Sequence, residues 1–163
     1  MLNAIFESQE YVHKQLPAVI IIQSVMSINI SLRNNYRIHI MSYRYRWIGN
    51  NIAFTFEGEI AFDELDQANC EIYSDPRLDL MNYAIYDFTH AKCFNLTDEE
   101  IRVIAKLDNC ISRWNMNLRL ACLGHDNDNV KDVINHYIEL MKDTGWKIKH
   151  FTDHGQAISW CLE

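Results

Sequence analysis

The sequence lacks the short motifs that would assign it to a common enzyme class. Its 163 residues contain no glycine-rich phosphate loop, no Gly-x-Ser-x-Gly nucleophile elbow and no His-Glu-x-x-His helix. The five cysteines are scattered, and no Cys-x-x-Cys pair occurs among them. An odd number of scattered cysteines indicates reduced, mostly buried thiols, as is typical of a cytoplasmic protein. We therefore expect a protein without enzymatic activity and without a bound cofactor or metal.

A long hydrophobic run and a signal peptide are also missing. The longest apolar stretch, residues 16–30, is interrupted by glutamine, serine and asparagine and is too short to span a membrane. The stretch before it carries Glu7 and Glu10 where a signal peptide would carry basic residues. We therefore expect a cytoplasmic protein that does not insert into a membrane.

The chain has fewer basic than acidic residues. The formal net charge is −7, and residues 1–40 carry three basic and two acidic side chains, so the net charge of residues 41–163 is −8. An acidic domain repels the phosphate backbone of nucleic acids and the surface of an anionic membrane. Neither nucleic acid nor a membrane is therefore expected as a partner.

Residues 1–40 differ in pattern from the rest of the chain. Segment 18–30 is rich in β-branched residues but shows no clear alternation, whereas orderly patterning begins at Met41. One interpretation is that Met41 is the natural start and that residues 1–40 are an upstream translation outside the native domain. The other is an N-terminal extension that packs on the domain, and a disordered tail is a third. Residues 41–163 are therefore expected to form one domain, and the status of residues 1–40 stays open.

From Met41 onward the chain alternates between strand-like and helix-like patterns. Residues 43–48 and 52–56 alternate in polarity on either side of Gly49-Asn50-Asn51, which predicts a β-hairpin. Apolar residues at helical spacing then predict an amphipathic helix over 61–73. Further strands are expected at 83–88, 118–123 and 146–151, with helices that start at 97, near 127–129 and after 153.

The resulting order is β-β-α-β-α-β-α-β-α. Strands that are separated by helices must be joined by crossover connections, so the later strands are expected to run parallel. The predicted fold class is therefore α/β, with a mixed sheet that has an N-terminal hairpin and mostly parallel later strands.

Polar residues mark the expected starts of three helices. Thr97 and Glu100 form a capping box, in which each side chain bonds the other residue's backbone amide. Asn127 or Asn129 is expected to cap the next helix, and Asp153 the last one.

Two glycines are expected to end elements. Gly58 follows the second strand and is expected to terminate it, and Gly145 is placed to end a helix in the left-handed conformation.

Beyond these elements, several segments together resemble a known family. The segments are 54–60 (FTFEGEI) with Phe62 and Leu65, 74–77 (SDPR), 85–88 (IYDF) with Ala91, 96–97 with 100–101, and 157–162 (AISWCL). With them, residues 41–163 resemble the SpoIIAA-like domains, which are grouped with STAS domains (sulfate transporter and anti-sigma factor antagonist). These domains share a β/α superhelix fold with the CRAL-TRIO lipid-binding domains. The resemblance implies a single SpoIIAA-like domain.

The resemblance also implies a function. The best-understood members are regulators that bind a partner kinase and are phosphorylated within an Asp-Ser-Ser/Thr-Gly-like motif at the start of the helix after the central strand. That motif is absent from residues 94–99, where Thr97 is the nearest hydroxyl and its role as a cap explains it. We expect a regulatory or protein-interaction domain that binds a protein partner or a second copy of itself. The alternative is a carrier or sensor of a lipid or small apolar ligand, held between sheet and helices.

Candidate site residues lie where strands are expected to end. Open parallel sheets bind ligands beyond the carboxyl ends of their strands, and these ends carry several His and Asp residues. Their spacing matches no metal motif, and turn-forming Asp with solvated His explains them without a function. The candidates for a ligand or partner edge are Asp87, Thr89, His90, Thr97, His125 and Asp126.

Aromatic side chains on the first strand form a further candidate surface. A sheet covered by helices on one face would leave the other face bare, and Tyr43, Tyr45 and Trp47 are expected there. A homodimer or residues 1–40 would cover such an apolar face.

Overall fold

The computed structural model describes residues 42–125 and 128–163. The predictions for residues 1–40, Asp126 and Asn127 lie outside these residues. The strands are β1 (Tyr43–Ile48), β2 (Asn51–Ala61), β3 (Tyr83–Asn95), β4 (Arg119–Leu123) and β5 (Lys147–Phe151). The helices are α2 (Phe62–Tyr73), α3 (Asp98–Ser112), α4 (Asp128–Met141) and α5 (His154–Cys161), with a short 3₁₀ helix η1 (Pro76–Leu80). The predicted element order is confirmed, and η1 is an addition to it.

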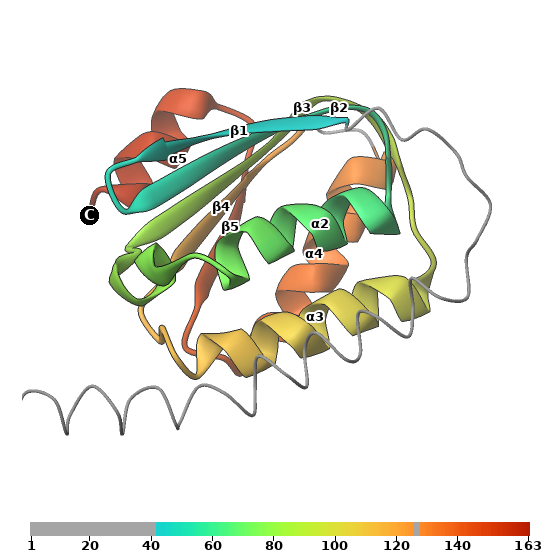
Figure 1. Ribbon diagram of the computed structural model, residues 1–163. Coiled ribbons are helices and arrows are strands. Elements are labelled where there is room, and N and C mark those ends of the chain that lie inside the picture. The colour runs from blue at the N-terminus through green and yellow to red at the C-terminus, as the bar shows by residue number, and fades with distance from the viewer. Residues whose placement is uncertain (1–41, 126–127) are drawn as a thin grey trace, which may run out of the picture. The chain divides into compact units, whose positions relative to one another are not determined.

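The five strands form one mixed sheet in the order β1-β2-β3-β4-β5 (Figure 1). β1 pairs with β2 in antiparallel fashion, and the remaining neighbours are parallel. The hairpin turn contains Gly49, whose φ of 61° is accessible to glycine without steric cost. The predicted hairpin and the predicted parallel crossovers are therefore both confirmed.

β2 and β3 are longer than predicted. Gly58 was expected to end β2, and that expectation is wrong, because β2 continues to Ala61 beside the second half of β3. The register shifts between Thr55 and Glu57 and again between Gly58 and Glu59. Gly58 has a φ of 79°, and such a residue lets a strand absorb a bulge and resume pairing.

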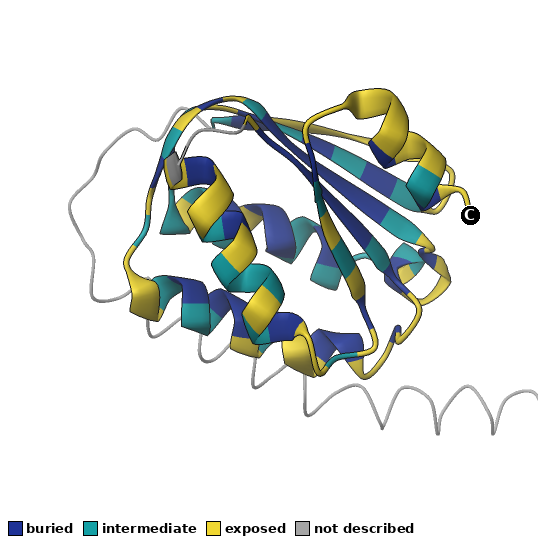
Figure 2. Cartoon of the chain, turned by 180° about the vertical axis from the view of Figure 1, so that it is seen from behind, coloured by how far each residue is buried: buried dark blue, intermediate teal, exposed yellow. Residues whose placement is uncertain are grey.

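The helices cover the two faces of the sheet unequally. Helices α2, α3 and α4 lie on one face and α5 lies on the other (Figure 1). The buried side of each helix is turned toward the sheet and the exposed side toward solvent (Figure 2). The large fully buried side chains under α2, α3 and α4 include Ile52, Phe54, Phe56 and Ile60 of β2.

The aromatic residues of β1 lie on the helix-covered face, so the prediction that they lie on a bare face is wrong. The Tyr43 ring is buried and lies 5.6 Å from that of Phe56. The hydroxyl of Tyr45 donates to Glu71 of α2 at 3.0 Å. Side chains on β1 alternate between faces, so these aromatics and the core residues of β2 share one side.

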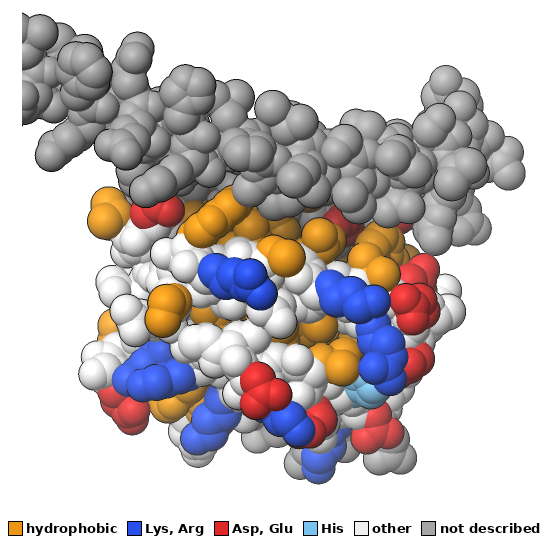
Figure 3. All heavy atoms as spheres, turned by 90° about the horizontal axis from the view of Figure 1, so that it is seen from below, with side chains coloured by type: hydrophobic (Ala, Val, Ile, Leu, Met, Phe, Trp, Pro, Cys, Tyr) orange, Lys and Arg blue, Asp and Glu red, His pale blue; other side chains and the backbone are white. Residues whose placement is uncertain are grey.

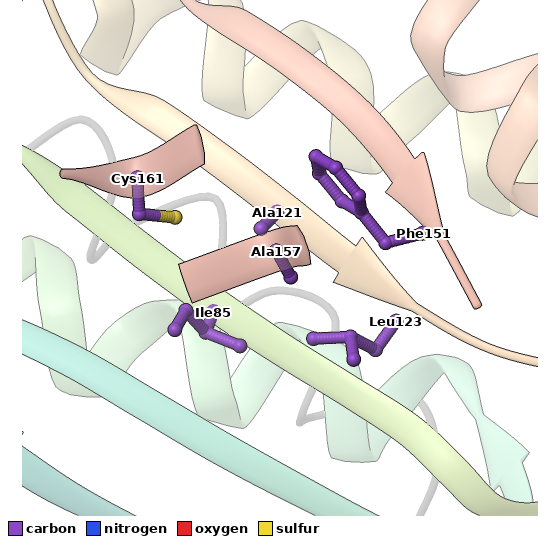
Figure 4. Close-up of a cluster of buried hydrophobic side chains, with 6 residues drawn as sticks. All are labelled: Ile85, Ala121, Leu123, Phe151, Ala157 and Cys161. Carbon is purple, nitrogen blue, oxygen red and sulfur yellow. The ribbon is translucent and has the colours of Figure 1, made fainter. Parts of the chain in front are cut away.

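A small cluster holds α5 against the opposite face. Ala157 and Cys161 of α5 are directed at the middle of the sheet, where small and branched side chains receive them (Figure 4). The buried members are Ile85, Ala121, Leu123, Phe151, Ala157 and Cys161.

Two of the predicted caps are confirmed. The Thr97 hydroxyl accepts from the amide of Glu100 at 3.2 Å, and the Glu100 carboxylate accepts from the amide of Thr97 at 2.9 Å. The Asp153 carboxylate accepts from the amide of Gln156 at 2.8 Å. Asn129 is not a cap but lies within α4, where its side chain accepts from the amide of Phe94 at 2.7 Å.

Gly145 does not have the predicted left-handed backbone, since the positive φ values among the described residues belong to Gly49 and Gly58. Instead, the absence of a side chain lets the backbone of Gly145 lie close to the backbone of Met116. A Cβ at this position would lie 2.6 Å from the carbonyl oxygen of Met116. Glycine is therefore required here, because the neighbouring loop leaves no room for a side chain.

Replacing Gly145 by alanine is expected to lower the free energy of unfolding by about 1–3 kcal/mol, because backbone must move to admit the methyl group. Urea denaturation measures this value. Gly155→Ala is the matched control, since that glycine lies within α5 and the nearest atom to its new Cβ is a carboxylate oxygen 3.3 Å away. The control should change stability by less than about 1 kcal/mol. Equal effects of the two substitutions would contradict the argument.

Candidate functional site

Two of the predicted edge residues are in contact. The Asp87 carboxylate accepts hydrogen bonds from the amide and the hydroxyl of Thr89, at 2.9 and 2.6 Å. Its other oxygen lies 3.5 Å from Nε2 of His154, at the start of α5. This contact joins β3 to α5, and the Asp87–Thr89 bonds lie within β3 at a register shift in its pairing with β2.

The predicted edge residues do not form the shared edge that was expected beyond the strand ends. Thr89 and His90 lie inside β3 rather than beyond it, because the strand runs to Asn95. Eight residues of β3 follow Asp87, and they span roughly 26 Å of extended chain. Thr97 comes after them and is therefore far from Asp87 along the strand. His125 is exposed and comes just after Leu123, the residue of β4 that pairs with Asp87.

The His and Asp residues of the candidate edge are not grouped as metal ligands in the described part of the chain. Among residues 42–125 and 128–163, no three His, Cys, Asp or Glu side chains are placed to share a metal ion. All five cysteines are free; Cys122 and Cys161 are buried, Cys70 and Cys93 are half-buried, and Cys110 is exposed.

A cavity of about 70 Å³ lies between the sheet and the three helices of the covered face. Its walls come from α2, α3 and α4 and from the middle of β3 and β4. Most of its lining side chains are aliphatic or aromatic: Leu65, Ile72, Ala84, Tyr86, Phe88, Phe94, Leu96, Ile101, Ile104, Leu118, Leu120, Cys122, Val133, Ile134 and Trp146. A concave, largely apolar site of this kind is the usual form of a small-molecule site.

The packing of α3 explains why space remains there. Helix α2 packs on β2, and α4 packs on β3 and β5, whereas the main contacts of α3 are with α4 and α2. Helix α3 therefore bridges the other two helices. The sheet surface beneath this bridge is not filled completely, and the cavity results.

A buried carboxyl group forms the polar part of the cavity wall. Asp108 of α3 is 4% exposed. Its carboxylate accepts from the hydroxyl of Tyr73 on α2, and from the hydroxyl of Tyr137 on α4 at 2.7 Å. One side chain thus connects all three helices that cover the cavity.

Burial sets the protonation behaviour of this cluster. Loss of solvent raises the pKa of Asp108 to about 6, although the hydrogen bonds from Tyr73 and Tyr137 act in the opposite direction. Burial also raises the pKa of both tyrosines well above their usual range, and the nearby Asp108 charge raises it further. The hydroxyls therefore remain donors, and Asp108 is the group that changes charge between pH 4 and 7.

A second polar pair completes the wall. The hydroxyl of Tyr86 on β3 donates to the side-chain oxygen of Asn69 on α2 at 2.6 Å, and both residues are buried. The pair fixes the ring of Tyr86 at the centre of the sheet, where it forms part of the cavity floor.

Sequence reasoning missed the Asp108 cluster, yet a signal was present. The spacing of Ile101, Ile104, Leu107, Ile111 and Trp114 predicts one apolar face for this helix. Ile101, Ile104 and Ile111 are indeed buried. Asp108 follows Ile104 by four residues and precedes Ile111 by three, so it lies on that same face. An acidic residue inside an apolar stripe must find donors or remain protonated. Trp114, assigned to that face, lies beyond the helix and is 40% exposed.

A groove of about 490 Å³ lies on the opposite face, beside α5. Arg44 and Arg46 of β1 line one part of it, with Asp87, His154 and Ile158 among the remaining lining residues. Arg44 forms an ion pair with Glu57. The groove is thus more polar than the cavity, and it contains the Asp87–His154 contact.

Charge on another part of the surface is mixed. On the face seen from the side of α3, Lys and Arg side chains alternate with Asp and Glu and with hydrophobic side chains (Figure 3). In addition, no helix of the described residues combines the length and hydrophobicity that crossing a bilayer requires.

Comparisons with known proteins give a similarity among solved structures. No protein-family model matches the chain, and no curated protein matches it. Among solved structures, it is similar to an uncharacterized protein of the DUF3478 family from Shewanella loihica PV-4, described as having a SpoIIAA-like fold. The identity is 16% and the TM-score is 0.46, over 79% of this chain and 99% of that one.

Proposed function

We propose that this domain is a non-enzymatic binding protein whose cavity between sheet and helices holds a small, mostly apolar ligand. The cavity of about 70 Å³ beneath α3 is the observation that supports this proposal. Well-packed cores leave few voids larger than a water molecule, because each void forfeits dispersion contacts. A space of this size, lined by side chains from three helices and two strands, is therefore better explained by an occupant than by loose packing.

The polar groups at the wall support binding rather than catalysis. Asp108 is held by two tyrosine hydroxyls and Asn69 by a third, so each is positioned. Cys122 also lines the cavity, and burial raises the pKa of its thiol to about 12, which keeps it a poor nucleophile. Phosphorylation of Thr97 is a weaker basis for function. Its hydroxyl is used in the capping box, and the acidic residues at positions 98–100 would repel a phosphate.

Filling the cavity is expected to abolish ligand binding. Val133→Phe places a ring into the space from α4, so the ligand and the new side chain cannot both fit. Native mass spectrometry of the untagged full-length protein should show a small bound mass for the parent protein and none for this variant. Val103→Phe is the matched control, because Val103 is a half-buried valine of α3 that does not line the cavity.

A parent protein without any small bound mass, under conditions that preserve its fold, would count against the proposal. Retention of the mass by Val133→Phe would place the ligand elsewhere on the protein.

A protein-interaction domain is the second candidate function. The groove beside α5 favours it, since Arg44 and Arg46 on an otherwise acidic domain would suit an acidic segment of a partner. The same native spectra separate the two candidates, because a partner or a second copy adds a mass of kilodaltons rather than hundreds of daltons.

A further inference from the structure

The polar atoms of the cavity wall belong to the Asp108 cluster and to the Asn69–Tyr86 pair. Asp108, Tyr73 and Tyr137 line the cavity together and are bonded to one another across three helices. Elsewhere the wall consists mainly of hydrocarbon and aromatic surface. A ligand in this space would therefore have one end against a carboxyl group and the rest against apolar side chains.

The carboxylate has unused hydrogen-bonding capacity. Its two oxygens offer about four acceptor positions. One hydroxyl occupies a position on each oxygen, Tyr73 on Oδ1 and Tyr137 on Oδ2. The remaining positions can accept further hydrogen bonds, and a ligand in the cavity would be able to supply donors to them.

The charge around Asp108 is not balanced by these contacts. The groups that act on its ionisation, apart from burial, are Tyr73, Tyr137 and Asp66. Two of these are neutral hydroxyls and the third is another acid, so none of the three is a cation. A buried carboxylate in this position favours a positive or donor-bearing neighbour and disfavours a negative one.

We propose that the cavity selects a small apolar molecule whose head group donates hydrogen bonds to Asp108, with cationic head groups favoured and carboxylates excluded. This inference rests on the proposed ligand-binding function and names the chemical class of the ligand. It separates the site from one for fatty acids, whose head group carries the same charge as Asp108.

The size of the cavity limits the ligand. One water molecule requires about 10–15 Å³ in this measure, so about 70 Å³ holds roughly five or six heavy atoms. Isobutyramidinium, isobutyramide and isobutyrate have this size and share one shape. They differ in charge and in donors, because the amidinium and the amide carry N–H groups and the carboxylate carries none.

The pH at which the probes bind is a second variable. Burial raises the pKa of Asp108 to about 6, so the amidinium should lose its advantage at pH 5, where the carboxyl is protonated. The titratable groups that face Asp108 are Asp66 and Tyr73 of α2, Tyr86 of β3, Cys122 of β4 and Tyr137 of α4. Burial raises the pKa of each of them, so the tyrosines and the thiol stay neutral in this range.

Titration of the three probes into the isotopically labelled full-length protein, followed by NMR, tests the inference. At pH 7.5 the amidinium is expected to bind about tenfold more tightly than the amide, and isobutyrate more weakly than either, from the typical strength of a charge-assisted hydrogen bond. Resonances of the cavity residues should respond, and those of the groove beside α5 should not.

Two substitutions assign the effect to Asp108. Asp108→Asn keeps the shape but removes the charge, so the order of the three probes should collapse to within about threefold. Asp66→Asn removes one neighbouring charge without touching the cavity wall, and the order should persist. If Asp108→Asn does not fold, the pH dependence of the parent protein serves instead, because the preference for the amidinium should be lost at pH 5 if Asp108 is its cause.

The outcomes separate the two proposals. Equal binding of all three probes, or tightest binding of isobutyrate, would overturn the inference and leave the cavity as a site for apolar ligands. Failure of every probe to shift cavity resonances would overturn both. Persistence of the order in Asp108→Asn would show that the overall acidic charge, rather than this carboxyl group, selects the cation.

Discussion

Replacing Asp108 by asparagine is expected to remove a pH dependence from the stability of this protein. The pKa of Asp108 is raised from 3.8 to about 6 in the folded state, and burial is the main cause. The folded state therefore binds the proton more strongly than the unfolded state does. Stability from this group is fully present below about pH 4 and is lost as the pH rises through about 6.

The expected size of this effect follows from the shift. A pKa that rises by about two units corresponds to about 3 kcal/mol between the protonated and ionised limits. Relative to the parent, Asp108→Asn should therefore gain up to about 3 kcal/mol of stability when the pH rises from 4 to 7. Urea denaturation of both proteins at pH 4, 5.5 and 7 measures the difference directly.

Asp98 provides a control on the same helix with the opposite sign. A hydrogen bond from Arg102 lowers the pKa of Asp98, so this group stabilises the folded state when it is ionised. Asp98→Asn should consequently lose stability relative to the parent as the pH rises through the range below about 4, and the difference should change little from pH 4 to 7. If the stabilities of the parent and of Asp108→Asn changed in parallel between pH 4 and 7, the Asp108 carboxyl would not be buried as described.

Replacing Phe54 by alanine is expected to cost about 3–5 kcal/mol of the free energy of unfolding. The Phe54 ring is fully buried in β2. Its centroid lies 5.3 Å from that of Tyr45 and 5.0 Å from that of Tyr86. Truncation removes these tilted ring contacts and leaves a hole at the centre of the sheet, where the backbone of neighbouring strands cannot collapse.

Tyr45→Ala is the matched comparison, because this ring belongs to the same cluster but is 39% exposed. Its removal lets water enter instead of leaving a void, so the expected cost is about 1–2 kcal/mol. Urea denaturation gives both values. Equal losses for the two substitutions would mean that Phe54 is not the centre of the core.

Much of the fold could be predicted because its signals are local. The hairpin, the amphipathic helices and the capping box depend on residues that are close in the sequence. The extent of β2 and β3 could not be predicted in this way, because the two strands support each other beyond the bulge at Gly58. The role of Gly145 was missed for a similar reason, since the carbonyl of Met116 that crowds it comes from another loop.

The candidate site was less accessible to sequence reasoning than the fold. Asp87 and Thr89 were expected at the end of a strand over residues 83–88, but β3 continues to Asn95 and both residues lie inside it. The Asp108 cluster draws one residue from each of three helices, and only the position of Asp108 in an apolar stripe hinted at it. Pattern analysis identifies faces of helices, whereas a cavity depends on how three faces meet.

The connection of three helices through Asp108 also has a consequence for the folding pathway. Tyr73 precedes Asp108 by 35 residues and Tyr137 follows it by 29, and each partner lies in a different crossover unit. All three units must dock before both hydroxyls reach the carboxylate, so we expect these bonds to form late in folding. Interactions of this kind leave the folding rate nearly unchanged and slow unfolding instead. We therefore expect the cluster to slow the separation of α2, α3 and α4 more than it speeds their assembly.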